Sequence, residues 1–274
     1  MELVRWQVGL GPRAPGLPGH RRLRERLADS LKDASDRLTV QEFQVPLPSG
    51  RELCANLSGL FRSQRPRRPP ILVGTHFDTR LIADREPDPK LRGLPIPGAN
   101  DGGSGTAVLL GLLPLLRRAS RRGELDRDVT VVFFDAEDVG GLGGLPFAFG
   151  ALRYCQEALQ GEAEEVLVLD MVGGLDLELD VDAHAWEHPP SLRLTRELFA
   201  LGKQSDPRAF RGARVRHIIC DQFPFLERGL ASCLLIDLDY PQWHTHADLP
   251  EAMAPGSLAT VAGVVERFLL SPAP

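Results

Sequence analysis

The chain has 274 residues, of which 43% are apolar, and its formal net charge is -5. This length and composition can bury one large core, so we expect a single domain over residues 1–274. The negative charge argues against the basic face that a nucleic-acid-binding protein needs. No apolar run is long enough to span a membrane, and residues 1–20 contain no apolar stretch typical of a signal peptide. We therefore expect a soluble, cytoplasmic monomer without nucleic-acid or membrane partners.

The N-terminal part predicts a helix followed by strands. Gly9–His20 is rich in Gly and Pro and is not expected to form regular structure. Leucines at every fourth position indicate an amphipathic helix over His20–Lys32. Alternating apolar residues in Leu38–Val45, followed by Glu52–Phe61, predict an antiparallel pair of strands. Ile71–Thr75 is a short apolar run that predicts a buried strand.

The middle of the chain begins with a long loop. Arg80–Gly98 is rich in proline and charge, and its length is typical of a functional loop. A helix is predicted over Ala99–Leu116, with a kink at Pro114. Arg117–Asp128 is rich in charge and is predicted to be a connection without regular structure. It leads to the buried strand Val131–Phe134, which is followed by adjacent acids and a glycine-dense turn at residues 140–146.

The rest of the chain continues the alternation of strands and helices. The further strands are predicted at Val166–Val172, Arg214–Ile219 and Ala231–Leu238. The further helices are predicted at Phe147–Leu159, His188–Lys203, Asp221–Arg228 and Gly256–Leu270. Such alternation indicates a mostly parallel sheet that is covered on both faces. The four cysteines show no C-x-x-C pair, so we expect reduced thiols in the core.

Polar residues stand where the predicted strands end or the predicted helices begin. They are His76, Asp78, Asp101, Glu137, Asp138, Asp170, Asp221 and His244. Each one alone has an ordinary explanation: Asp101 suits a helix N-cap, and His76 suits a hydrogen-bonded core histidine. Parallel strands, however, place their carboxyl ends at one edge of a sheet, so we expect these residues to converge.

This set of side chains points to a metal. Imidazole and carboxylates without thiolates suit a catalytic zinc that keeps one position open for substrate. Asp101, Asp138 and His244 come from distant parts of the chain, as the ligands of catalytic metals usually do. Glu137 precedes a ligand and, on an extended backbone, would point the other way. It is therefore free to act as a general acid or base beside the metal.

These segments and their neighbours resemble those of a known family. The segments GTHFDTR, GANDGGSG, FFDAEDVG, VLDMVGG, CDQFPFLERG and YPQWHTHAD are similar to the zinc-dependent aminopeptidases of peptidase family M28 and to their glutaminyl cyclase branch. The likeness covers nearly the whole chain, including the lead-in GPRAPGLPGH. It implies a three-layer α/β/α sandwich around a mixed, mostly parallel sheet. It also implies that Asp101, Asp138 and His244 hold zinc and that Glu137 is the base.

Two activities remain open within this resemblance. In the cyclases, Asp170 and Asp221 match positions that share a hydrogen-bond network with the base, and one zinc is enough. In the aminopeptidases, His76 and Asp170 complete a second metal site, with Asp101 bridging the two metals and Asp78 behind the ligands. All of the residues for the second site are present, so two metals are expected if the protein is an aminopeptidase.

Three features favour the cyclase. Asp138 stands where aminopeptidases more often have Glu, Trp243 directly precedes His244, and DQFPFLERG resembles a cyclase segment. The resemblance places Trp243, Gln222 and Phe223 in the substrate pocket, although Gln222 replaces the histidine of the cyclases. We expect a glutaminyl-peptide cyclotransferase that converts the N-terminal glutamine of peptides or proteins to pyroglutamate and releases ammonia. The alternative is an aminopeptidase that hydrolyses the N-terminal peptide bond.

A non-catalytic member of the family is a third hypothesis, but it is disfavoured because neither the base nor a ligand is lost. His246 and Asp248 are expected to orient His244 or the pocket rim. The other histidines, at positions 20, 184, 188 and 217, are expected to be surface or packing residues.

Overall fold

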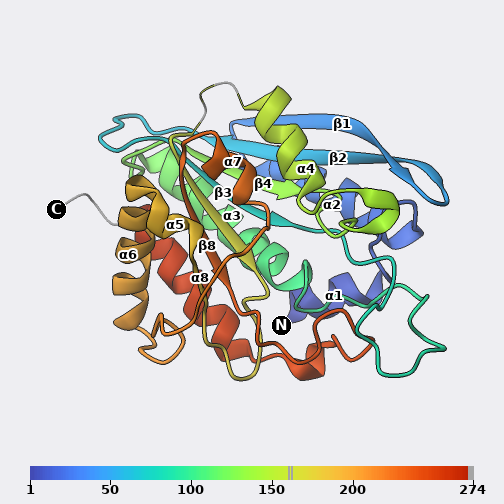
Figure 1. Cartoon of the computed structure of the whole chain (residues 1–274). Coiled ribbons are helices and arrows are strands. Elements are labelled where there is room, and N and C mark those ends of the chain that lie inside the picture. Colours follow the sequence, from blue (N-terminus) through green and yellow to red (C-terminus); the bar gives the residue numbers. More distant parts are fainter. Residues whose placement is uncertain (160, 162, 271–274) are drawn as a thin grey trace.

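A six-stranded sheet runs through the computed structural model, which describes residues 1–159, 161 and 163–270 (Figure 1). In their order across the sheet, the strands are β1 (Arg37–Leu47), β2 (Gly50–Phe61), β4 (Val129–Phe134), β3 (Ile71–His76), β5 (Glu165–Asp170) and β8 (Ala231–Ile236). The last four pair in parallel, whereas β2 is antiparallel to both β1 and β4. The sheet is therefore mixed and mostly parallel, as predicted.

The central strands are buried on both faces because their sequences are apolar at successive positions. Every residue of β3 and β4 is buried. In β4, Val131 and Phe133 belong to one apolar core, while Val132 and Phe134 belong to a second core on the other face. Each such side chain contributes about 1.5–3 kcal/mol through burial. Successive apolar side chains of each central strand point to opposite faces of the sheet. Helices must therefore cover both faces.

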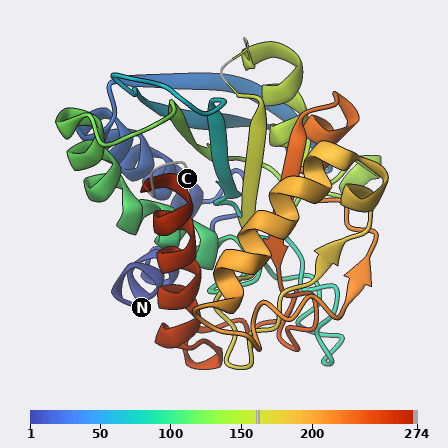
Figure 2. The ribbon, with the colours of Figure 1, turned by 90° about the vertical axis from the view of Figure 1, so that its left-hand side faces the viewer.

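Long helices cover the first face. They are α2 (Pro18–Ala34), α3 (Gly103–Arg122), α6 (Pro189–Lys203) and α8 (Pro255–Leu270), and α1 (Glu2–Gly9) packs against α3. Figure 2 shows α8, in red, beside α3, in green. The leucines of α2 at positions 23, 27 and 31 are fully buried, as the predicted amphipathic pattern requires.

Shorter helices cover the second face. They are α4 (Phe149–Arg153), which continues into the π-helical turn η2 (Tyr154–Ala158), and α7 (Phe223–Glu227). The two helical layers confirm the predicted α/β/α sandwich. Outside these layers lie the 3₁₀ turns η1 (Leu142–Gly144) and η3 (Pro250–Ala252), the helix α5 (His184–Glu187), and a small sheet of β6 (Val181–Asp182) with β7 (Val215–Arg216).

Two predicted elements differ most from the observed ones. The connection predicted at Arg117–Asp128 is helical as far as Arg122, because Leu116 and Ala119 continue the buried side of α3 past Pro114. That helix ends at Gly123, whose φ of 67° closes it. The strand predicted at Arg214–Ile219 is reduced to the two residues of β7. It lies outside the main sheet because Arg214 and its neighbours pair with acidic residues instead of a core.

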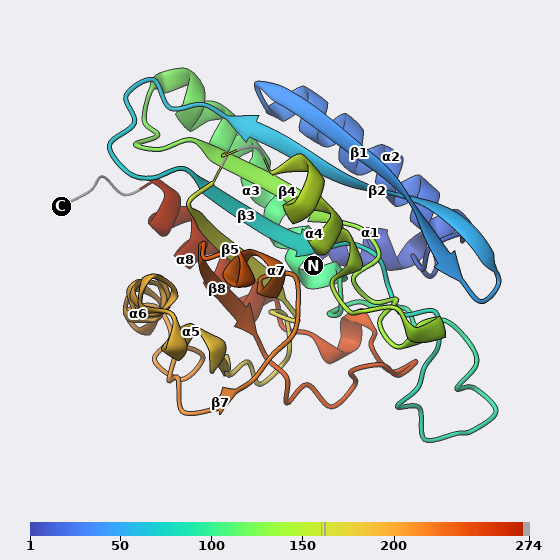
Figure 3. The same cartoon turned by 45° about the horizontal axis from the view of Figure 1, so that its top comes forward.

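The long loop of residues 80–98 lies on the side of the molecule toward which the parallel strands point (Figure 3). Figure 3 shows β3 pointing toward the side of the molecule on which the loop of residues 80–98, in teal, projects. The four cysteines are buried and form no disulfide, as predicted. Across the described residues, the helices are too short or too polar to cross a membrane.

Candidate active site

The candidate site lies at the sheet edge where the parallel strands end. β3 ends at His76 and β5 ends at Asp170, while the segment after β4 carries Asp138. These strands are parallel neighbours, so their carboxyl ends meet at this edge. Two further residues arrive from loops: Asp101 precedes α3, and His244 follows β8. The edge therefore collects side chains from distant parts of the sequence.

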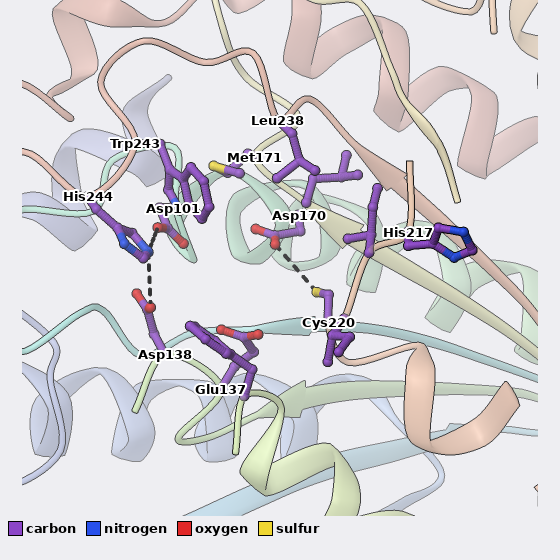
Figure 4. Close-up of a pocket in the computed structure, with 14 residues that line it drawn as sticks. Asp101, Glu137, Asp138, Asp170, Met171, His217, Cys220, Leu238, Trp243 and His244 are labelled. Carbon is purple, nitrogen blue, oxygen red and sulfur yellow. Dashed lines mark hydrogen bonds and ion pairs between the residues drawn. The ribbon is translucent and has the colours of Figure 1, made fainter. Parts of the chain in front are cut away.

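Asp101, Asp138 and His244 form a compact group that is suited to a metal (Figure 4). Nε2 of His244 lies 3.3 Å from Oδ1 of Asp138 and 3.6 Å from Oδ2 of Asp101. All three residues are buried. Within the described residues, Oδ2 of Asp101 and Oδ2 of Asp138 have no hydrogen-bond partner. A buried carboxylate oxygen without a donor is costly, so this donor set fits a zinc ion.

A second group shares Asp101 with the first. Nε2 of His76 lies 3.2 Å from Oδ1 of Asp170 and 3.3 Å from Oδ1 of Asp101. Nδ1 of the same ring is 3.6 Å from Oδ1 of Asp78. The structure thus brings together the residues predicted for a second metal site, with Asp101 between the two groups and Asp78 behind His76.

The backbone after β4 places both Glu137 and Asp138 at the pocket. Ala136 has a φ of 59°, which turns the chain sharply after the strand. The Asp78 carboxylate accepts hydrogen bonds from the N–H groups of Glu137 and Asp138, both at 3.1 Å. The expectation that Glu137 points away from Asp138 is wrong. Alternation holds only along an extended strand, and β4 has already ended at Phe134.

Glu137 is a buried carboxyl group that belongs to neither metal group. Burial raises the pKa of Glu137 well above its ordinary value; the His76 ring opposes this rise, and the carboxyl groups of Asp221 and Asp138 add to it. A bound cation beside Glu137 would oppose this rise. A carboxyl group at such a position can accept a proton and return it in the course of a reaction.

Asp170 and Asp221 differ in their surroundings. Asp170 contacts His76 and accepts a hydrogen bond from the Cys220 thiol at 3.4 Å. Asp221 is fully buried, and neither of its carboxyl oxygens has a hydrogen-bond partner among the described residues. Burial raises the pKa of Asp221 well above its ordinary value. Both groups lie close enough to act on the charge of Glu137, but among the described residues no hydrogen bond joins Asp221 to Glu137.

Asp248 fixes the loop that carries Asp101. Its carboxylate accepts hydrogen bonds from the backbone N–H groups of Asn100 (2.8 Å) and Asp101 (3.1 Å) and from the Tyr240 hydroxyl (2.8 Å). Asp248, which was expected to orient His244 or the pocket rim, therefore positions the loop of the candidate ligand Asp101. Gly102 follows with a φ of 73°, and a Cβ at this position would collide with the carbonyl oxygen of Asp78. Only glycine lets this loop pack so closely.

The acids and His244 line a cavity of about 350 Å³. Its walls are largely apolar, which suits the binding of a small side chain. The lining residues are Asp101, Glu137, Asp138, Phe147, Asp170, Met171, His217, Ile218, Ile219, Cys220, Ile236, Leu238, Trp243 and His244. The indole of Trp243 stands beside the His244 ring, with 4.5 Å between ring centroids.

Gln222 and Phe223, which were predicted to bind substrate, are not among these lining residues. The buried Gln222 amide donates hydrogen bonds to the Asp182 carboxylate and to the Ile218 carbonyl, both at 2.9 Å. Phe223 packs against the His184 ring, 4.9 Å away. In this arrangement Gln222 supports the wall that Ile218 contributes.

The sequence did not predict several residues that lie at the site, and it predicted other roles for some. The buried Arg80 and the neighbouring Asp84 contact Asp138 and His244, and the charge-rich, proline-rich loop was the only signal of them. His217, expected to be a surface or packing residue, lines the cavity. His246, expected to orient His244 or the pocket rim, binds Glu86 through its backbone N–H and its ring and so joins two loops.

A further buried pair supports the turn before Glu137. Nε2 of His20 is 2.7 Å from Oδ1 of Asp135, and Oδ2 of Asp135 accepts the N–H of Ala55 at 2.8 Å. Both members of the pair are fully buried. Burial lowers the pKa of His20, but the charge of Asp135 outweighs this effect and raises it above 6.5.

The sequence and the fold are similar to those of known proteins. A family model described as Peptidase family M28 matches residues 56–269. None of the curated proteins matches this sequence. Similar solved structures include a Zn-dependent exopeptidase from Parabacteroides distasonis, with 23% identity and a TM-score of 0.87 over 99% of this chain and 96% of that chain. Tannerella forsythia glutaminyl cyclase has 24% identity and a TM-score of 0.86 over 99% and 97%.

A leucine aminopeptidase precursor from Bacteroides thetaiotaomicron has 24% identity and a TM-score of 0.87 over 99% of this chain and 96% of that chain. At these identities the likeness shows the fold. It extends over nearly the whole chain and includes proteins with two different activities.

Proposed function

The chain belongs to peptidase family M28, and on that premise we propose that it is a zinc-dependent glutaminyl-peptide cyclotransferase. Its substrate is the N-terminal glutamine of a peptide or protein, and its products are a pyroglutamyl peptide and ammonia. The observation that carries this proposal is the position of Trp243. Its indole stands beside His244 and lines a small, largely apolar cavity that also holds Glu137. Glutaminyl cyclases among the solved structures of the same fold support it.

Asp101, Asp138 and His244 would hold the zinc. Their buried, unpaired carboxylate oxygens and the imidazole Nε2 supply the negative charge and the donor atoms that zinc prefers. When bound, zinc supplies a Lewis acid that polarises the side-chain amide carbonyl of the substrate. One zinc is enough for the cyclisation, because the nucleophile is the α-amino group of the substrate itself.

Glu137 moves the proton in this reaction. The α-amino nitrogen forms a bond with the carbonyl carbon of the glutamine side chain, and the bond from that carbon to the amide nitrogen breaks. Glu137 accepts a proton from the attacking amine and delivers it to the departing nitrogen, which leaves as ammonia. Its raised pKa suits both steps, since the same group must take and return a proton.

The apolar wall serves the cyclisation by excluding water. Trp243, Ile218 and Leu238 line the same cavity as the acids. An apolar enclosure of this kind favours attack by the tethered amine over attack by water. It also favours a compact, folded glutamine side chain, which the five-membered product ring requires.

A second candidate function follows from the group of His76, Asp101 and Asp170. These residues bring ligand atoms within 4.8 Å of one another. If this group held a second metal, the protein would be an aminopeptidase, in which water is the nucleophile. The similar structures of a Zn-dependent exopeptidase and of a leucine aminopeptidase precursor support this alternative.

Metal content separates the two candidates. We expect one zinc per chain in the purified protein by elemental analysis, lost in His244→Ala and retained in His76→Ala. Two metals per chain, with one lost in His76→Ala, would instead favour the aminopeptidase. His184→Ala, which alters a histidine outside both groups, is the control for nonspecific loss of metal.

A further inference from the structure

The loop of residues 80–98 contacts the segment that carries His244 through several neighbouring side chains. Asp84 contacts the His244 ring, and the Arg85 guanidinium lies 3.8 Å from the centroid of the Trp243 ring. Glu86 accepts hydrogen bonds from the backbone N–H and the ring of His246. The two loops therefore meet along successive residues.

Asp84 sits on the side of the His244 ring that faces away from the candidate ligands. Oδ1 of Asp84 is 2.9 Å from Nδ1 of His244, while Nε2 of the same ring faces Asp101 and Asp138. A carboxylate at this position holds the proton on Nδ1. The lone pair of Nε2 is then directed toward the metal group.

Arg80 links Asp84 to a second ligand. Its guanidinium pairs with both carboxylate oxygens of Asp84, at 3.1 and 2.8 Å. The same side chain is buried and donates hydrogen bonds to the carbonyl oxygens of Asp138 (2.9 Å) and Gly140 (3.0 Å). Asp84 and Arg80 thus connect His244 with the turn that carries Asp138.

The backbone of His244 needs such support. Its φ of 58° is uncommon for a residue with a side chain, and such a conformation persists only when its surroundings hold it. The Arg85 N–H donates a hydrogen bond to the His244 carbonyl oxygen at 3.3 Å. Both the ring and the backbone of this ligand are therefore held by the loop of residues 80–98.

We propose that Asp84 is a positioning residue, which orients His244 for zinc and, through Arg80, ties His244 to Asp138. This inference rests on the zinc of the proposed function, but not on the reaction that the zinc serves. Neither residue touches the cavity, so both act through the ligands. The Glu86–His246 contact joins the same two loops without touching a ligand, so it has the simpler role of loop docking.

The matched pair Asp84→Asn and Glu86→Gln separates positioning from docking. Each variant turns one carboxylate into an amide in the same loop, and both carboxylates contact the same opposing segment. The Asp84 side chain is 39% exposed, so its replacement leaves no cavity. The thermal unfolding of the metal-free variants verifies that both are folded.

Two readouts are taken without substrate: zinc affinity by competition with a chromogenic chelator, and the visible absorption spectrum of the protein saturated with cobalt. We expect Asp84→Asn to weaken zinc binding by about 10- to 100-fold and to change the cobalt spectrum. Glu86→Gln should match the wild type in both readouts.

Equal zinc affinity and an unchanged cobalt spectrum in Asp84→Asn would overturn the inference, as would equal losses in the two variants. A wild-type protein that binds no zinc would overturn both this inference and the proposed function. A wild-type protein that binds zinc but does not cyclise glutamine would overturn the proposed function alone, because the two readouts do not depend on turnover.

Discussion

Glu137→Gln is the substitution that most sharply tests the division of roles at the site. The amide has nearly the same size as the carboxyl group, so the packing of this buried position is kept. The backbone N–H of residue 137 still binds Asp78, and no atom of its side chain belongs to a metal group. We therefore expect the variant to retain its zinc.

The expected loss of activity follows from the proton transfer alone. An amide cannot take a proton from the attacking amine and return it to the leaving nitrogen. Removal of a general acid–base group typically lowers kcat by about 10²- to 10⁴-fold. This corresponds to about 2.7–5.4 kcal/mol of activation free energy.

The same substitution should stabilise the metal-free protein. A carboxyl group whose pKa rises on folding takes up protons in the folded state, so it lowers stability at any pH above its unfolded value of 4.5. The amide has no charge to desolvate. We expect a higher Tm for metal-free Glu137→Gln than for metal-free wild type at neutral pH.

The assay combines initial rates of ammonia release from a glutaminyl dipeptide amide with zinc content and thermal unfolding. A variant that keeps its zinc and a substantial part of the wild-type kcat would refute the role of Glu137. A variant that loses its zinc would show instead that Glu137 is a ligand. An unchanged or lower Tm would contradict the argument from burial.

Three other predictions concern the surroundings of the site. Trp243→Ala removes the wall beside His244 and should lower kcat/KM by roughly 30-fold or more, because truncation of a central Trp costs about 2 kcal/mol or more; an unchanged value would show that Trp243 does not contact the substrate. Asp248→Ala leaves two buried N–H groups unpaired and should lower the free energy of unfolding by roughly 2–6 kcal/mol in denaturant titrations; a loss below this range would mean that water replaces the carboxylate. His20 has a raised pKa, so its charged pair with Asp135 stabilises the fold fully below the ordinary value of 6.5, and this contribution is lost as the pH rises through the raised pKa. The difference in unfolding free energy between wild type and His20→Gln should therefore shrink with rising pH, and a constant difference would contradict the assignment.

The sheet and part of the candidate metal group could be predicted because their signals are local. Val131–Phe134 is an unbroken apolar run, and its end coincides with the start of the acids. Parallel pairing then carries the residues at strand ends to one edge without further information. The convergence of His76 and Asp170 follows from this rule, whereas Asp101 and His244 reach the same edge from loops.

The rest of the site depends on contacts that no local pattern records. Arg80 is an arginine in a polar loop, and its burial follows only from the carbonyl and carboxylate groups that other loops bring to it. The turn at Ala136 reverses the expected direction of Glu137 because the Asp78 carboxylate binds two successive N–H groups. Both features arise when loops from different strands pack together.

Helix boundaries show the same limit. The arginines after Leu116 suggested a solvated connection, but arginines on one side of a helix are solvated as well. The predicted strand at Arg214–Ile219 failed for a related reason. Its alternation places Val215 in solvent and its arginines against acids, so no core fixes it in the main sheet.

The product formed from a glutaminyl dipeptide amide tests the central claim most directly. The wild-type, zinc-loaded protein should release ammonia and leave the pyroglutamyl product with its peptide bond intact. Release of free glutamine without ammonia would contradict the cyclase and identify the protein as an aminopeptidase. The same assay on Glu137→Gln shows whether the measured product depends on the site described above.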